Sequence, residues 1–201
     1  QAMACARTSP ALAEPDVQLH FLPLSYDITP EVECAASANM TREPTISITA
    51  NVCHPFSRGA VRLRSADAAQ MPIVRHQLLG DERDAKTLVE ACKLMEKLFG
   101  TRAMKGTVVS DRAPSPRPQS DADWERYVRD HAMVCYHPVG TCRMGSDEAS
   151  VVDPRLAVRG LQGLRVIDAS VMPSLISANT NAPTIMIGER GADFILEKVA
   201  A

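Results

Sequence analysis

The sequence has 201 residues, of which 45% are hydrophobic and 23% charged, and its formal net charge is -2. A chain of this length can form one domain with its own core, or one domain and part of another. The small negative charge argues against nucleic acid as a partner, no apolar run approaches the ~20 residues that a transmembrane helix requires, and no signal-peptide pattern follows Gln1.

The sequence contains six cysteines: Cys5, Cys34, Cys53, Cys92, Cys135 and Cys142. A domain of this size does not need disulfides for stability, so scattered cysteines favour free thiols and a reducing, cytoplasmic compartment. Peripheral membrane association of a longer form stays open. The alternative interpretation is a metal site built from Cys135, His137 and Cys142, but it lacks a CxxC pair and a clear fourth ligand.

Three short segments in the first third alternate apolar and polar residues with the period of a half-buried strand. They lie at residues 17–21, 46–52 and 61–63. Pro55 and Gly59 separate the second segment from the third, so these two are expected to pair as antiparallel strands.

Residues 81–99 change to the period of an amphipathic helix, with a stripe of leucine, methionine and other apolar residues. Asp81 or Asp84 can cap the start of this helix, and Gly100 can end it. The strands and the helix together predict an α+β fold in which the helix covers one face of an antiparallel sheet.

Three prolines between Ala113 and Pro118 predict an extended surface connection. Ser120 follows, with Asp123 three residues later, which is typical of a capped helix start. Three histidines of the chain are interpreted as structural or exposed: His20, His54 and His131. A strand histidine needs only one hydrogen-bond partner, and the last of the three shares an apolar helix face.

The apolar run from Leu164 to Ile167, with a turn on each side, predicts a buried strand of a parallel sheet. The last helix is expected to begin near Asn181 or Ala182, with Pro183 in its first turn. Its buried face is expected to comprise Ile185, Gly188, Ala192, Ile195 and Val199.

Two motifs in the last third carry the strongest functional signal. The first is YHPVGTCRMG at residues 136–145, a histidine framed by proline and glycine; the second joins LRVIDAS at 164–170 to NTNAPT at 179–184. Together they resemble the C-terminal signature of the glucose–methanol–choline (GMC) family of flavin-dependent alcohol oxidoreductases, and most closely its bacterial choline-dehydrogenase-like branch. The resemblance covers roughly residues 120–197, and a looser likeness reaches back to residue 15.

The resemblance implies that His137 is the active-site histidine, acting as base or as stabiliser of the alkoxide beside the flavin. An imidazole suits this role because its ordinary pKa of ~6.5 lies near neutral pH. The second family position, a histidine or asparagine, falls on Asn181, whose amide can donate a hydrogen bond to the substrate oxygen. The alternative for Asn181 is a cap of the last helix, a role that Asn179 could share.

The resemblance also implies residues that contact FAD. Asp168 and Ala169 match positions near the ribityl and phosphate part of the cofactor. The start of the last helix, where free N–H groups favour negative charge, matches positions near the flavin pyrimidine. The residues concerned there are Asn181, Ala182, Pro183 and Thr184. Cys142 is interpreted as a packing residue.

None of the ten glycines forms the GxGxxG turn that a dinucleotide-binding fold requires. We therefore expect the C-terminal part of a longer FAD-dependent alcohol dehydrogenase or oxidase. Residues 1–135 are predicted to form its substrate-binding domain, and residues 136–201 to supply the active-site loop, strand and helix that complete its FAD-binding domain.

The expected partners are a small-molecule alcohol and the missing N-terminal FAD domain. The chain alone is expected to bind no FAD and to oxidise no alcohol, and exposed apolar residues such as Val166, Ile185 and Ile195 should favour self-association. Two alternatives stay open: a binding module without catalysis, and a metal- or cysteine-dependent hydrolase. The identity of the alcohol, and oxygen or a quinone-like carrier as electron acceptor, stay open as well.

Overall fold

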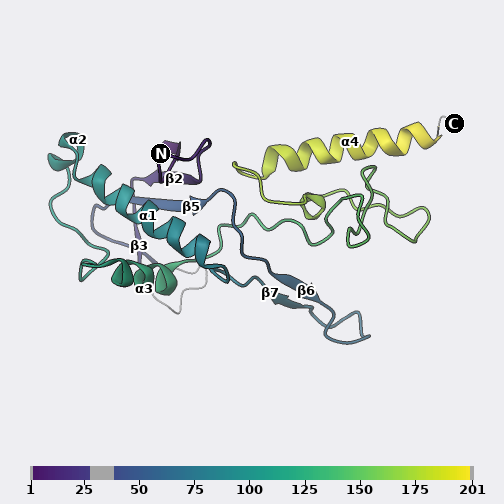
Figure 1. Cartoon of the computed structure of the whole chain (residues 1–201), viewed down its shortest axis with the longest axis horizontal. Helices are drawn as coiled ribbons and strands as arrows, with labels where there is room; N and C mark the ends of the chain where they lie inside the picture. The colour runs from purple at the N-terminus through teal and green to yellow at the C-terminus, as the bar shows by residue number, and fades with distance from the viewer. Residues whose placement is uncertain (1, 28–38, 200–201) are drawn as a thin grey trace. The chain divides into compact units, whose positions relative to one another are not determined.

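The computed structural model of the chain describes residues 2–27 and 39–199 (Figure 1). The chain divides into two compact units. Unit 1 comprises Gln1–Gly59 and His76–Cys135, and unit 2 comprises Ala60–Arg75 and Tyr136–Ala201. Residues 60–75 thus group with the C-terminal part of the chain, while the functions assigned to residues 1–135 and 136–201 stay predictions.

Unit 1 combines a small antiparallel sheet with helices. Its elements are β1 (Ala2–Ala6), β2 (Val17–Leu22), β3 (Tyr26–Asp27), β4 (Asn39–Met40), β5 (Ser47–Val52), α1 (Glu82–Phe99), α2 (Arg102–Lys105) and α3 (Asp121–His131). The main sheet has the order β1-β2-β5, so β2 is its central strand, and β3 pairs with β4 separately. The predicted α+β class is confirmed at this level.

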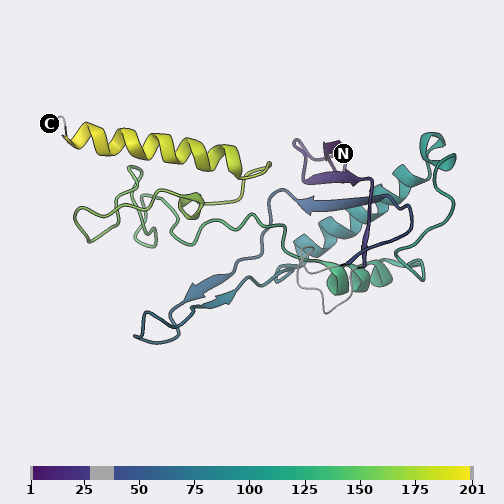
Figure 2. The same ribbon diagram turned by 180° about the vertical axis from the view of Figure 1, so that it is seen from behind.

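Helix α1 packs against one face of the main sheet, as the sequence predicted (Figure 2). The contact is apolar: Val17 and Leu19 of β2 are buried against Ala91 of α1. The helix begins as expected, because the Asp81 side chain accepts a hydrogen bond from the backbone N–H of Arg83. An adjacent side of α1 packs on α3 around the buried Trp124.

The predicted caps of α1 and α3 are present. Gly100 ends α1, and its N–H donates to the carbonyl of Glu96. The side chain of Ser120 accepts from the N–H of Asp123, whose carboxylate in turn accepts from the Ser120 N–H, a reciprocal capping box. His131 ends α3, bonded to the Tyr127 carbonyl, which agrees with a structural role.

The predicted pairing of the second and third strands is wrong. Strand β5 pairs with β2, whereas β6 (Ala60–Arg62) pairs antiparallel with β7 (Ile73–Arg75). β1 has few residues of high strand propensity, and β7 is only three residues long, so the alternation pattern did not reveal either strand. Pro55 and Gly59 therefore lie in the connection between β5 of the main sheet and β6 of the separate hairpin.

Unit 2 contains the β6–β7 hairpin, a 3-10 helix η2 (Ala169–Val171) and the long helix α4 (Asn181–Val199). Its core consists of six buried residues: Val152, Leu156, Val171, Met172, Ile187 and Phe194. Helix α4 starts where the sequence predicted, with Pro183 in its first turn. The side chains of Lys198 and Val199 lie outside the described residues.

Two expectations about unit 2 are wrong. Residues 164–167 form no strand; Arg165 makes one isolated bridge to Ala157, and the described residues contain no parallel sheet. A buried parallel strand needs neighbours on both sides, and the described chain supplies none. The buried face of α4 consists of Ile187, Gly191 and Phe194, while Ile185 and Ile195 are exposed by 58% and 46%.

Candidate active site

His137 lies in a loop of unit 2 and is held by two side chains from the entry to α4. Its Nδ1 lies 2.8 Å from Oγ1 of Thr180, and its Nε2 lies 2.9 Å from Nδ2 of Asn179. An amide nitrogen can only donate, so Nε2 accepts, and Nδ1 carries the hydrogen and donates it to Thr180. The imidazole is therefore a neutral ring whose Nε2 can take up a proton.

The structure thus brings together the two motifs that the sequence singled out. The contacts come from Asn179 and Thr180, however, and not from Asn181. Apart from belonging to the NTNAPT motif, Asn179 was considered only as a possible cap, and Thr180 was given no role. A hydroxyl residue next to a helix start is the signal that could have identified Thr180, because such residues usually bond to nearby groups.

Asn181 is the first residue of α4, and its side chain is exposed. Among the described residues it makes no side-chain hydrogen bond, so it does not cap the helix. The first hydrogen bonds of α4 run instead to the carbonyl of Thr180, which accepts from the N–H and the hydroxyl of Thr184 at 3.0 and 2.6 Å. Asn181 is free to bind a group outside the chain.

The loop around His137 needs unusual backbone conformations. Tyr136 has a φ of 60°, which is rare for an aromatic residue, and Gly140 has a φ of 88°. A Cβ atom at Gly140 would also lie 3.3 Å from the carbonyl oxygen of Met172. The backbone of Cys142 is bonded to Ser170 at 3.0 Å, which fixes this loop against η2. Strained residues of this kind often flank functional sites.

Asp168 and Ala169 lie at the start of η2. The exposed carboxylate of Asp168 accepts a hydrogen bond from the N–H of Ser170 at 2.8 Å and so caps this short helix. Ala169 packs on the core of unit 2. Neither placement tests a contact with FAD, and the roles of both residues, like those of Ala182, Pro183 and Thr184, stay predictions.

In the part of the chain that the structure describes, no three histidine, cysteine or acidic side chains are placed to share a metal ion. Cys34 lies outside this part. Burial raises the pKa of the Cys135 thiol, although a hydrogen bond from Asn51 opposes the rise. No described helix is long and apolar enough to span a bilayer.

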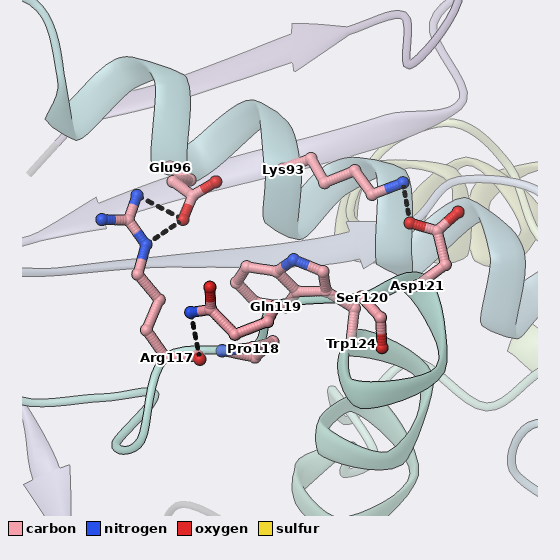
Figure 3. A pocket seen from close by; sticks show the side chains of 8 residues that line it. All are labelled: Lys93, Glu96, Arg117, Pro118, Gln119, Ser120, Asp121 and Trp124. Carbon is pink, nitrogen blue, oxygen red and sulfur yellow. Dashed lines mark hydrogen bonds and ion pairs between the residues drawn. The ribbon is translucent and has the colours of Figure 1, made fainter.

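A separate hollow of about 440 Å³ lies in unit 1 between α1 and the segment that leads into α3 (Figure 3). Two ion pairs form its walls: Arg117 with Glu96 at 2.5 Å, and Lys93 with Asp121 at 2.8 Å. Because these charged groups neutralise one another at the surface, the hollow has no free base or acid for catalysis.

Comparison with known proteins agrees with the motifs. A family model described as GMC oxidoreductase matches residues 55–188. The chain is 40% identical to the alcohol dehydrogenase (acceptor) of Pseudomonas putida over 195 residues, 96% of this chain and 34% of that protein. It is 38% identical to the oxygen-dependent choline dehydrogenase of Rhizobium rhizogenes over 204 residues, 98% of this chain and 35% of that protein.

The chain is also similar to solved structures of longer proteins. Pyridoxine 4-oxidase from Mesorbium loti matches with a TM-score of 0.80 and 26% identity, covering 95% of this chain and 36% of that one. A variant of formate oxidase from Aspergillus oryzae also reaches 0.80 with 27% identity, covering 93% of this chain and 32% of that one. The chain therefore spans about a third of the length of the proteins it matches.

Proposed function

Because the chain belongs to the GMC oxidoreductase family, we propose that it is part of an FAD-dependent enzyme that oxidises the CH–OH group of alcohols. The observation that carries this proposal is the neutral imidazole of His137, held by Thr180 and Asn179 at the start of α4. Relatives named as alcohol and choline dehydrogenases support the substrate class.

In this proposal His137 accepts the hydroxyl proton at Nε2. The hydrogen bond from Nδ1 to Thr180 fixes the tautomer and stabilises the ring once it becomes positively charged. In this structure the Asn179 amide donates to Nε2. When the alcohol binds, its hydroxyl replaces the amide as the donor to Nε2. The amide of Asn181, which is exposed at the helix start, then donates to the substrate oxygen.

The start of α4 fits the pyrimidine edge of a flavin. Asn181 and Ala182 are exposed there, their N–H groups precede the first intrahelical hydrogen bond, and the first turn contains no acidic residue. This end of a helix favours a partner with negative charge. FAD, when bound, supplies the acceptor for the hydride of the alcohol carbon. The residues of this chain bind and orient the alcohol and remove its hydroxyl proton.

A larger part of the enzyme is needed for FAD binding in this proposal. Several apolar side chains of α4 outside its buried face are exposed: Ile185, Met186, Ile195 and Leu196. We infer that they pack on the N-terminal part of the FAD domain, which also supplies the glycine turn for the pyrophosphate. By itself the chain should self-associate through this face.

The first test uses the full-length enzyme. His137→Ala should lower the rate of flavin reduction by roughly 10²–10⁴-fold, the usual contribution of a positioned general base. Stopped-flow absorbance of the flavin under anaerobic conditions measures this rate. His76→Ala, which changes an exposed histidine, is the control and should reduce flavin normally. An unchanged rate in His137→Ala would remove this histidine from the mechanism.

Two further variants separate the neighbours of the imidazole. Thr180→Val keeps the shape of the side chain but removes the hydrogen-bond acceptor for Nδ1, so the reduction rate should fall with FAD still bound. Asn181→Ala should also slow flavin reduction with FAD retained. If Asn179→Ala slows the reaction and Asn181→Ala does not, the substrate contact belongs to Asn179 instead.

The second test uses the 201-residue chain alone. After incubation with excess FAD and gel filtration, it should retain no flavin, because it lacks the glycine turn for the pyrophosphate. Absorbance and flavin fluorescence of the protein peak measure retention. Stoichiometric FAD on the isolated chain, or alcohol oxidation by it, would contradict the proposed division of the enzyme.

A further inference from the structure

The hollow of unit 1 combines a buried tryptophan with charged side chains. Trp124 is 7% exposed and packs on Val89 and Val128, between α1 and α3. Its indole also lines the hollow, where Figure 3 shows it between the two ion pairs of the wall. The volume of about 440 Å³ lies in the usual range of small-molecule sites, and an aromatic ring among a few polar groups is typical of their lining.

The indole N–H of Trp124 is a donor without an acceptor. None of the hydrogen bonds and ion pairs drawn among the lining residues in Figure 3 involves the indole, and Nε1 has no partner elsewhere in the described chain. An unpaired donor on a side chain this buried lowers the stability of the folded state. A phenylalanine would pack there without that cost, so packing alone does not explain the tryptophan.

The Trp124 nitrogen is still within reach of a molecule from outside. The one fully buried side-chain nitrogen or oxygen without a partner among the described residues belongs to Gln18, so Nε1 of Trp124 is not sealed in the core. Because an indole nitrogen can only donate, a ligand in the hollow must offer it an acceptor.

The charged side chains of the wall are occupied with one another. Lys93 lies 2.8 Å from Asp121 and 2.8 Å from Glu90, and Arg117 contacts Glu96 at 2.5 Å through both Nε and Nη2. A charged ligand would have to separate one of these pairs and would replace one attraction by another of the same kind. The wall therefore favours a ligand without net charge.

The same contacts leave several oxygens unpaired. Each ion pair with the wall uses one carboxylate oxygen, Oδ1 of Asp121 and Oε1 of Glu96. The Gln119 amide donates to the Arg117 carbonyl at 2.9 Å. Oδ2 of Asp121, Oε2 of Glu96 and Oε1 of Gln119 have no partner among the described residues. The hollow thus presents three acceptors beside the one indole donor, and a hydroxyl is the uncharged group that can both donate and accept.

We propose that this hollow binds a neutral polyhydroxy compound, a sugar or a linear polyol. One hydroxyl oxygen of the ligand accepts from Nε1 of Trp124, and neighbouring hydroxyls donate to Glu96, Gln119 and Asp121. No covalent step is involved. The site belongs to unit 1 alone, and the proposal does not depend on the catalytic role of His137.

The test uses the full-length enzyme labelled with fluorinated tryptophan. Fluorine NMR reports on the indole of Trp124, whose signal is identified by its loss in Trp124→Phe. D-glucose, or its open-chain counterpart sorbitol, should shift this signal saturably with a Kd of roughly 1–10 mM, as a few neutral hydrogen bonds provide. Cyclohexanol has a ring of the same size with a single hydroxyl and should leave the signal in place.

Two variants remove one hydrogen bond each. Gln119→Leu deletes an acceptor at an exposed position and should raise the Kd roughly three- to tenfold, and Gln70→Leu, at another exposed glutamine, is the matched control. Trp124→Phe deletes the donor but keeps an aromatic ring. Its affinity, measured by isothermal titration calorimetry, should fall by a similar factor with an unchanged circular dichroism spectrum. The result for Gln119→Leu stands even if Trp124→Phe does not fold.

The proposal would be overturned if neither polyol shifts the Trp124 signal at concentrations well above the expected Kd, or if Gln119→Leu binds as the wild type does. A larger response to choline or to acetate would also overturn it, because the ligand would then be charged. His137→Ala should bind the polyol normally. A loss of binding in that variant would place the ligand at the candidate active site and would contradict this inference while leaving the proposed function intact.

Discussion

Each of the two units is stabilised internally by a different kind of interaction. In unit 1, ladders of backbone hydrogen bonds join the strands, and capped helices cover the sheet and one another. In unit 2, residues 136–180 contain only three isolated bridges and the short η2, all within a stretch that the structure describes completely. In this region side-chain hydrogen bonds connect the segments, as backbone ladders connect the strands of unit 1.

Arginine side chains show this clearly. Arg159 donates to the Ser150 hydroxyl at 2.8 Å and to the Gly145 carbonyl at 2.6 Å, and so joins two turns of the loop region. The carboxylate of Asp153 caps the following turn through the N–H groups of Arg155 and Ala157. A scaffold of this kind can hold His137 in a strained loop because it does not require a regular backbone.

The largest expected effect sharpens this contrast within unit 1. Asp84 of α1 is buried and accepts hydrogen bonds from the N–H groups of Phe56 and Ser57, both at 2.8 Å. The Ser57 hydroxyl donates to the same carboxylate. Asp84→Ala should therefore lower the free energy of unfolding by about 3–5 kcal/mol, because three hydrogen bonds to a buried carboxylate are lost and their donors stay partly shielded from water. Urea unfolding of the 201-residue chain, followed by fluorescence of its single tryptophan, Trp124, measures it.

Glu82→Ala, at an exposed carboxylate in the same helical turn, is the control and should shift the midpoint by less than about 0.5 kcal/mol. Hydrogen exchange of α4 should be unchanged in Asp84→Ala. Equal losses of protection in α1 and α4 would contradict the division into two units.

The same contrast explains what the sequence could predict. In unit 1 the α1 stripe, the Asp81 cap and the Ser120–Asp123 capping box are local signals, and the structure confirms them. Asp84 was considered only as a cap, because nothing in the sequence indicates that residues 56–57 fold back onto it. Pairing partners of strands are non-local too, which is why β5 was paired with the wrong strand.

In unit 2 the two motifs lie side by side in the structure, but the sequence did not predict which side chains contact His137. The choice among Asn179, Thr180 and Asn181 depends on how the chain turns into α4. The buried face of α4 was also shifted, because Ile185 and Ile195 follow the helical period as well as Ile187 and Phe194 do. Periodicity cannot rank two apolar faces of one helix.

The next prediction tests that assignment of the α4 face. A Cβ atom at Gly191 would lie 2.4 Å from a side-chain carbon of Ile167, whereas one at Gly188 would meet nothing within 4 Å. Gly191→Ala should therefore destabilise unit 2 by about 1–3 kcal/mol through overpacking. Gly188→Ala should stabilise α4 by about 0.5–1 kcal/mol, because alanine is the better helix former.

Hydrogen exchange of α4 in the isolated chain compares the two variants, and Trp124 fluorescence should not respond to either. Equal effects of the two alanines on α4 would mean that Gly191 does not pack on Ile167, and the face predicted from the sequence would then regain support.

The smallest expected effect concerns the capping box of α3, a feature of unit 1 that has no counterpart at Asn181. Ser120→Ala removes the acceptor for the Asp123 N–H and should cost about 1 kcal/mol at neutral pH, measured by the Trp124 unfolding curve.

The hydrogen bond from the Ser120 hydroxyl also lowers the pKa of Asp123 below its usual range. A lowered carboxylate pKa stabilises the fold above the pKa of the unfolded chain, and this stabilisation is lost as pH falls through the folded pKa. The difference between wild type and Ser120→Ala should therefore shrink below about pH 4, while Ser115→Ala, at an exposed serine of the proline-rich segment, should match the wild type throughout. A difference that stays constant into acid would show that the hydroxyl acts without Asp123, and the reciprocal cap would be reduced to a single hydrogen bond.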